Sequence, residues 1–361
     1  MRRYSRAATV ALAVLLAAWT PTPTLGASWS KPQLVGPADC FSVDTAIDSA
    51  GRYHLAATCG GSIRYSVSKG DGQWATTVFR HPYELRDLNP RVAVDGNFVY
   101  LAYSRTDTAA GACDDGIVRL AVYYRRRSLP DGAWSAPRRI GQSADQLVSL
   151  KVEAGTVHAI LWNANDGRFY YETVNGGVSH RYLIPGSGPS LSVGTDGRAR
   201  IAYALAGSVR YSLFSGSGFW RSRVTESSGG SVPSLALGEG DQAYLLWTRR
   251  GEFFCGSYPE PALADGTYFG TNTSGAWVSG RVTTDVGATS LTSDPSTGRV
   301  YGLLANDGAV AFFMRSSAGA WSRTNIGPGY AWSPVIRRDP TTGTLLVVYI
   351  SEYRVNVITK R

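Results

Sequence analysis

From residue 28 onward, apolar and polar side chains alternate in short runs, and glycine-containing turns separate these runs. A period of two is typical of β-strands that bury one face. No segment after residue 27 repeats its apolar residues at helical spacing. One phrase occurs twice, as GSIRYSVSKGDGQW at residues 61–74 and as GSVRYSLFSGSGFW at residues 207–220. The pattern therefore predicts an all-β protein built from repeated units.

Each unit opens with an alternating apolar strand that has a polar end. Seven such openings occur, at FSVDTAID (41–48), NPRVAVD (89–95), QLVSLKVE (146–153), GPSLSVGTDG (188–197), SVPSLALGEG (231–240), ATSLTSDPSTG (288–298) and WSPVIRRDPTTG (332–343). A second run such as YHLAAT or VHAILWN follows, then a third such as SIRYSVS, and a glycine turn leads to a fourth. Four short strands per unit predict the blades of a β-propeller.

The last unit ends at Arg361 after three strands, whereas the segment SWSKPQLVG at residues 28–36 resembles a fourth strand, AWSAPRRIG at 133–141. We therefore expect a seven-bladed β-propeller of four-stranded blades, closed by an N-terminal strand that completes the last blade. Closure removes an open sheet edge, which would otherwise invite aggregation.

A tryptophan follows the turn between the third and fourth strands in five units, at Trp74, Trp134, Trp220, Trp277 and Trp321. These rings could form a series of sugar-binding platforms. A repeated aromatic residue at one blade position more often packs between neighbouring units. We therefore predict that they cover the seams between blades.

The first residues have the pattern of a secretory signal. Arg2, Arg3 and Arg6 precede the apolar run 7–19, which is shorter than the roughly 20 residues needed to cross a bilayer. We expect the domains to be a signal peptide at 1–27 and the propeller at 28–361. Removal of the signal takes away three arginines and no acid, so the net charge falls from +9 to +6. Such a charge favours an anionic extracellular partner, for example an acidic polysaccharide.

Other classes of partner are less favoured. The densest basic run is Arg125–Arg127, which is too short for a typical nucleic-acid tract. We expect no nucleic-acid or membrane partner, no cofactor and a monomer.

The four cysteines, Cys40, Cys59, Cys113 and Cys255, allow two disulfides in three connectivities, and their spacing matches no metal site. The favoured pairing joins Cys40 to Cys59 within the first unit and Cys113 to Cys255 between two long insertions. Sequence alone leaves the three alternatives open.

Functional residues of a propeller are expected on one face, where the connections before the first strand and between the second and third strands surround the channel mouth. Units 2 and 5 carry long insertions there, at 104–116 and 248–266, and unit 2 has the longest entry loop, at 80–89. The candidate catalytic residues are His81, Tyr83, Glu84, Asp87, Asp107, Glu352 and Tyr353. The candidate substrate-binding residues are Arg86, Arg105, Arg249, Arg250, Tyr330 and Trp332.

Carboxylates, arginines and aromatic rings at one rim are typical of a sugar site. Two carboxyl groups roughly 5 to 9.5 Å apart can cleave a glycosidic bond, and arginine forks bind carboxylates. Each charged loop residue can equally be a solvated charge or part of a weak ion pair. His81 is the histidine predicted to act as an acid or base, whereas His54 and His158 lie in second strands and are predicted to be structural.

The repeat as a whole resembles the secreted sialidase-like, Asp-box-type propeller superfamily. The Asp box is approximated by Ser68, Asp71, Gly72 and Trp74, and again by Ser128, Asp131, Gly132 and Trp134. The resemblance implies a carbohydrate-active protein that cleaves an extracellular acidic glycan at the channel mouth, as a glycosidase or a polysaccharide lyase. The alternatives are a lectin-like sugar-binding propeller and, third, a protein-interaction scaffold.

Overall fold

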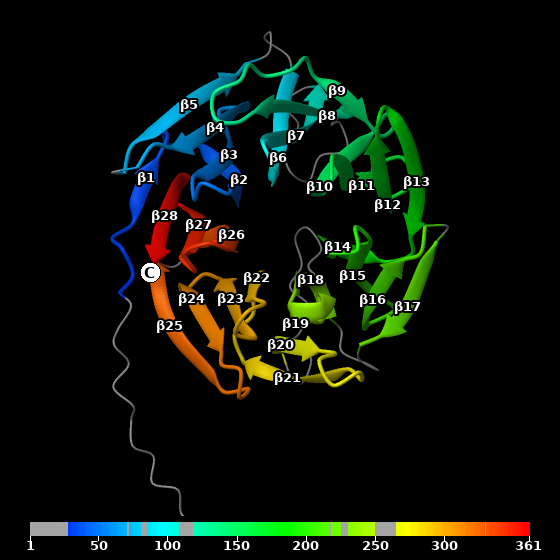
Figure 1. Cartoon of the computed structure of the whole chain (residues 1–361), viewed down its shortest axis with the longest axis vertical. Helices are drawn as coiled ribbons and strands as arrows, with labels where there is room; N and C mark the ends of the chain where they lie inside the picture. Colours follow the sequence, from blue (N-terminus) through cyan, green and yellow to red (C-terminus); the bar gives the residue numbers. More distant parts are fainter. Residues whose placement is uncertain are drawn as a thin grey trace, which may run out of the picture.

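The computed structural model describes residues 28–70, 72–80, 85–107, 118–216, 218–224, 230–249, 265–328 and 330–361. Its strands form seven four-stranded antiparallel sheets, arranged as the blades of a ring around a central channel (Figure 1). The predicted all-β, seven-bladed propeller is therefore confirmed. No helix in these ranges is long and apolar enough to cross a membrane. The predicted signal peptide at 1–27 lies outside the described residues.

The first three blades run from the channel outward in chain order. Their strands are, for blade 1, β2 (Cys40–Ile47), β3 (Tyr53–Cys59), β4 (Ser62–Ser68) and β5 (Trp74–Phe79); for blade 2, β6 (Leu85–Asp95), β7 (Phe98–Asp107), β8 (Val118–Ser128) and β9 (Arg138–Ile140); for blade 3, β10 (Asp145–Glu153), β11 (Thr156–Asn163), β12 (Arg168–Asn175) and β13 (Val178–Ile184).

The next three blades repeat this order, with the 3-10 turn η1 (Glu239–Asp241) between two strands of blade 5. Their strands are, for blade 4, β14 (Ser187–Val193), β15 (Ala199–Leu205), β16 (Ser208–Phe214) and β17 (Phe219–Arg223); for blade 5, β18 (Gly230–Leu237), β19 (Ala243–Arg249), β20 (Gly266–Thr271) and β21 (Val278–Thr283); for blade 6, β22 (Ala288–Asp294), β23 (Arg299–Ala305), β24 (Ala309–Arg315) and β25 (Trp321–Pro328).

Blade 7 is assembled from both ends of the propeller. It consists of β26 (Ala331–Arg338), β27 (Leu345–Ser351), β28 (Arg354–Lys360) and the N-terminal strand β1 (Gln33–Val35). β1 pairs with β28 in the register Gln33↔Val357 to Val35↔Val355, and an isolated bridge joins Trp29 to Lys360. The blue β1 lies beside the red β28 in Figure 1. The predicted closure is confirmed.

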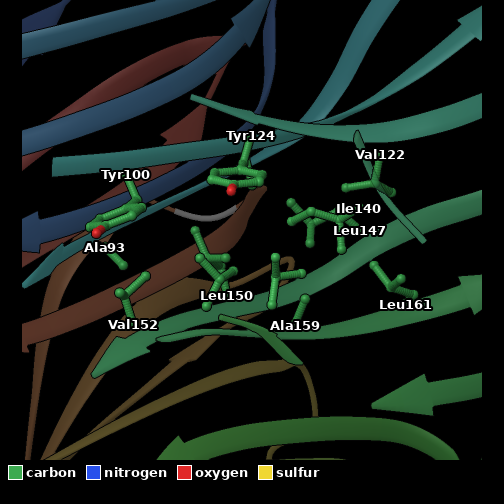
Figure 2. Packing of buried hydrophobic residues seen from close by; sticks show 13 residues of the cluster. Ala93, Tyr100, Val122, Tyr124, Ile140, Leu147, Leu150, Val152, Ala159 and Leu161 are labelled. Atoms are coloured by element: carbon green, nitrogen blue, oxygen red, sulfur yellow. The ribbon is translucent and has the colours of Figure 1, made fainter. Parts of the chain in front are cut away.

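The core lies between neighbouring sheets, because each blade buries both faces against its neighbours. Figure 2 shows one such seam, where Tyr100 and Tyr124 of blade 2 face Leu150 and Val152 of blade 3. These four side chains are at most 8% exposed. This packing explains why a single blade cannot be stable alone.

The repeated tryptophans pack across the seams, as predicted. Trp134 meets Tyr65 of the preceding blade edge-on, with ring centroids 5.0 Å apart. Trp321 meets Phe269 edge-on at 5.1 Å, and Trp277 meets Tyr211 at 5.3 Å with the rings tilted. In the closing blade, Trp29 of the N-terminal segment takes this position against Phe312, at 4.9 Å. The side chain of Trp220 is not among those described.

Blade 1 contains the predicted disulfide between Cys40 and Cys59, which are directly opposite each other on β2 and β3. Cys113 and Cys255 lie outside the described residues, so their pairing stays a prediction.

Candidate functional site

The mouth of the channel is the end at which each first strand begins. Backbone hydrogen bonds tie the entry segments to the turns between second and third strands, for example Asp87 N–H to the Gly61 carbonyl at 3.1 Å and Cys40 N–H to the Tyr353 carbonyl at 2.8 Å. Both kinds of connection therefore gather on one face, as expected. A hollow of about 320 Å³ opens there, lined by residues of blades 1, 2, 6 and 7 that include Phe41, Asp44, Arg91, Ser333 and Arg337.

Bulges in the first strands shape this hollow. In blades 2, 4, 5 and 7 the register shifts at an X-Pro pair, namely Asn89-Pro90, Gly188-Pro189, Val232-Pro233 and Ser333-Pro334. The residue before each proline has a positive φ of 45° to 56°. Proline is tolerated because the first strand is a sheet edge facing the channel. These four dipeptides were a sequence signal for the channel mouth that our sequence analysis missed.

Two exposed aromatic residues and one half-buried one, from blades 7 and 1, come together beside the hollow. We call Phe41, Trp332 and Tyr353 the mouth platform. The rings of Trp332 and Tyr353 meet edge-on with centroids 5.3 Å apart, and Trp332 Nε1–H donates to the Phe41 carbonyl at 3.2 Å. Tyr353 is 61% exposed and Phe41 40%, and Tyr330, two residues before Trp332, is 74% exposed. Clusters of exposed aromatic residues often mark binding sites.

The backbone around the platform adopts rarely populated angles. Tyr330, Ser333, Glu352 and Tyr353 have φ values of 55°, 49°, 50° and 59°. Glu352 and Tyr353 form the two-residue turn between β27 and β28, where both residues need positive φ. Blade 1 makes the equivalent turn with Gly60 and Gly61, which suit this geometry. Non-glycine residues in this conformation cost roughly 1 kcal/mol or more each and concentrate at functional sites.

Charged groups form the floor of the hollow. Asp44 Oδ1 accepts from Arg337 Nη2 at 3.0 Å, and Oδ2 accepts from the Val92 backbone N–H at 3.1 Å. Arg91 donates instead to the carbonyls of Val148, at 2.8 Å, and Pro90, at 3.0 Å. Both oxygens of Asp44 are engaged, whereas the guanidinium of Arg91 meets no carboxylate among the described residues.

The described parts of two predicted loop segments of blade 2 are strands instead. β6 begins at Leu85 and β7 extends to Asp107, so Arg86, Asp87 and Arg105 lie on a ladder rather than in loops. Asp87 is directly opposite Arg105, and Arg105 Nε lies 3.0 Å from Asp87 Oδ1. This cross-strand pair explains why β6 and β7 extend into the expected loops, because opposite charges that face each other stabilise a strand pair. Local alternation does not reveal such a pair.

The ion pair of Asp87 and Arg105 lies beside the aromatic rings of Tyr103 and Tyr123. Asp87 is 1% exposed, and the Arg105 guanidinium lies 4.5 Å from the centre of the Tyr123 ring. Arg86 is exposed, and its side chain lies against Gly61 of blade 1. Arg249 ends β19 on the mouth side of blade 5. The roles assigned to these four residues stay predictions.

The remaining candidates divide into two groups. Glu352, Tyr353, Tyr330 and Trp332 come together at the mouth of blade 7. His81, Tyr83, Glu84 and Arg250 lie outside the described residues, as does the side chain of Asp107. Within the described ranges no three His, Cys, Asp or Glu side chains are grouped so as to hold a metal ion.

The two second-strand histidines are buried, as predicted. His158 Nδ1 lies 2.7 Å from the Tyr171 hydroxyl, and burial lowers the pKa of His158 to about 4. His54 bridges Asp48 and Tyr65 at 3.1 and 2.5 Å. Burial also lowers the pKa of His54, although hydrogen bonding to Asp48 opposes this effect. Both imidazoles therefore serve the packing of their blades.

Sequence comparison adds no relative: no model of a known protein family matches the chain, and no curated protein matches it. Solved structures do match. An inactive variant of virginiamycin B lyase from Staphylococcus aureus with quinupristin is 14% identical, with a TM-score of 0.62 over 92% of this chain and all of the other. Penicillium chrysogenum α-L-arabinanase with arabinobiose is 12% identical, with a TM-score of 0.57 over 89% and 93%.

The NanB sialidase of Streptococcus pneumoniae is 10% identical, with a TM-score of 0.50 over 92% of this chain and 70% of that one. The expected sialidase-like neighbour is thus present, while the Asp-box resemblance stays a prediction. At these identities the likeness shows that this chain shares the propeller fold with the lyase, the arabinanase and the sialidase.

Proposed function

We propose that this protein is a carbohydrate-active propeller that binds an extracellular acidic glycan at the channel mouth and cleaves it there. The observation that carries the proposal is the mouth platform, in which the exposed rings of Phe41 and Tyr353 flank the half-buried Trp332 beside a polar hollow. Aromatic rings offer flat apolar surface to a sugar ring, while nearby polar groups fix its orientation. Ser42, Asn89, Ser290 and Ser333 supply such groups around the hollow.

An acidic sugar fits the charge of the site. Arg91 and Arg337 both line the hollow, and only the Asp44 carboxylate accompanies them in its lining. Arginine is well suited to bind the carboxylate of a uronate or sialate. The positive charge of the mature chain would also attract such a polymer.

Cleavage is favoured over binding alone because three other blades lack the aromatic ring at the position of Trp332 in the part of the chain that the structure describes. At the bulge positions that correspond to Trp332, blades 2, 4 and 5 carry Leu88, Ser187 and Ser231. A lectin-like propeller would be expected to repeat its pocket from blade to blade, whereas an enzyme needs one. The candidate acids and bases are Glu352, next to Tyr353, and the entry residues His81, Tyr83 and Glu84.

The Cys40–Cys59 disulfide supports an extracellular location, because disulfides persist in oxidising compartments. The predicted signal peptide supports the same proposal.

The test is incubation with a panel of acidic polysaccharides, with reducing ends and the ultraviolet absorbance of unsaturated uronates both measured. Reducing ends alone indicate hydrolysis, and both signals together indicate a lyase. Retained glycan binding without either product would support the lectin-like alternative. If the protein neither cleaves nor binds any polysaccharide of the panel, the proposal is overturned.

A further inference from the structure

The channel continues below the mouth as a second hollow of about 190 Å³. Its lining comes from the first strands of blades 7, 1, 2 and 3 and includes Lys151 and Arg337. Arg337 also lines the mouth hollow, so it stands where the two spaces meet. All the lining residues of this second hollow are described.

Positive charge in this part of the channel exceeds negative charge. Arg337 is paired with Asp44 at 3.0 Å, and Arg338, which also lines the lower hollow, is paired with Asp294 at 3.1 Å. Arg91 donates only to backbone carbonyls, and Lys151 has no hydrogen bond or ion pair with any described residue. Arg91 and Lys151 thus form no ion pair with a carboxylate of the described residues, although both feel the charge of Asp44.

Apolar residues such as Ile47 and Val94 share the lining of the lower hollow with the charged groups, whereas the side chains of Leu150 and Val152 belong to the seam shown in Figure 2. A cleft in which one sign of charge predominates raises the local concentration of counter-ions. Burial lowers the pKa of Lys151 to about 8, and the nearby Arg337 adds to this effect while Asp44 opposes it. The ammonium group is therefore still mostly protonated at pH 7.

We propose that the channel binds an oxyanion, a carboxylate, phosphate or sulfate group, between Lys151 and Arg337, with Arg91 adding positive charge from the mouth side. The anion would give Lys151 the partner that the described protein residues do not supply. It has two potential sources: a free ion from solution, or the acidic group of a glycan that reaches down from the mouth. The site does not require that the protein act on glycans.

Isothermal titration of the mature protein with sodium sulfate at pH 7 in a low-salt buffer tests the proposal. We expect saturable one-to-one binding by the wild type and at least tenfold weaker binding by Lys151→Met. The matched control Lys69→Met removes an exposed lysine outside the channel lining and should bind sulfate like the wild type. Near-ultraviolet circular dichroism and thermal unfolding verify that both variants are folded.

Absence of saturable sulfate binding by the wild type, or equal affinity in folded Lys151→Met, would overturn the proposal. A second titration distinguishes the two sources. If sulfate weakens the binding of an acidic oligosaccharide in proportion to its occupancy, the site accepts the acidic group of the glycan. If the two bind independently, it accepts a free ion. Sulfate binding itself is measured without any glycan, so its failure is separate from failure of the proposed function.

Discussion

Protonation of His158 should be costly in the folded protein, because its imidazole is 4% exposed and stacked on Tyr171. Burial lowers the pKa of His158 from its usual 6.5 to about 4. The unfolded chain therefore binds this proton more tightly than the folded one. The stability that depends on a neutral His158 imidazole is complete above pH 6.5 and is lost as the pH falls from 6.5 toward 4.

The size of the effect follows from the pKa difference. Each pH unit between the two pKa values corresponds to about 1.4 kcal/mol, so lowering the pH from 7 to 4.5 should remove about 2 kcal/mol of unfolding free energy through His158 alone. The variant His158→Gln lacks the titrating group while keeping a polar side chain opposite the Tyr171 hydroxyl. Its loss of stability between pH 7 and 4.5 should be about 2 kcal/mol smaller than that of the wild type.

Urea unfolding followed by fluorescence at the two pH values measures this difference. The control is His180→Gln, since His180 is an exposed histidine on β13 of the same blade. It should lose the same stability as the wild type on acidification. If His158→Gln and the wild type lose equal stability between pH 7 and 4.5, burial of a neutral imidazole at this position is refuted.

Three further predictions concern the platform, a seam and the ring closure. Tyr353→Gly should raise the free energy of unfolding by up to about 1 kcal/mol, because glycine accepts positive φ. The same variant should bind glycan more weakly, and unchanged affinity in a titration would contradict the binding role of the mouth platform. Trp134→Ala should lower the free energy of unfolding, measured in urea, by about 3 kcal/mol, because the contacts with Tyr65 and Phe79 are lost. A loss below 1 kcal/mol would show that the ring does not stabilise the seam. Deletion of residues 28–36 uncovers the edge of β28, so the shortened protein should unfold at a lower temperature and aggregate on size-exclusion chromatography; an equally stable monomer would contradict closure by β1.

The architecture was accessible from sequence because its signals are local and repeated. Alternation, turn glycines and the tryptophans recur in each unit, and the likeness of 28–36 to 133–141 predicted how the ring closes. The seam contacts of Trp134, Trp277 and Trp321 follow from the same repetition, since one position in equal units meets one kind of neighbour.

The site was less predictable because its contacts join distant parts of the chain. Trp332 and Tyr353 were identified as candidates, but Phe41, the third member of the mouth platform, was not. It belongs to blade 1 and meets blade 7 only through ring closure. The pairing of Asp87 with Arg105 depends on strand register, which alternation does not specify.

The channel charges were missed for a similar reason. Arg91, Lys151 and Arg337 each occupy an ordinary position in an alternating strand. Nothing local indicates that three different blades direct them toward two neighbouring hollows that share Arg337.

The central claim is that a glycan binds on the mouth platform, and the most direct test is the affinity of Trp332→Ala for the acidic glycan selected from the panel. The matched control is Phe98→Ala, which removes an aromatic residue, 38% exposed, next to the turn at the opposite end of blade 2. We predict that Trp332→Ala binds at least tenfold more weakly, a loss of about 1.4 kcal/mol or more, while folded Phe98→Ala binds like the wild type. Equal affinity of folded Trp332→Ala and the wild type would contradict the account.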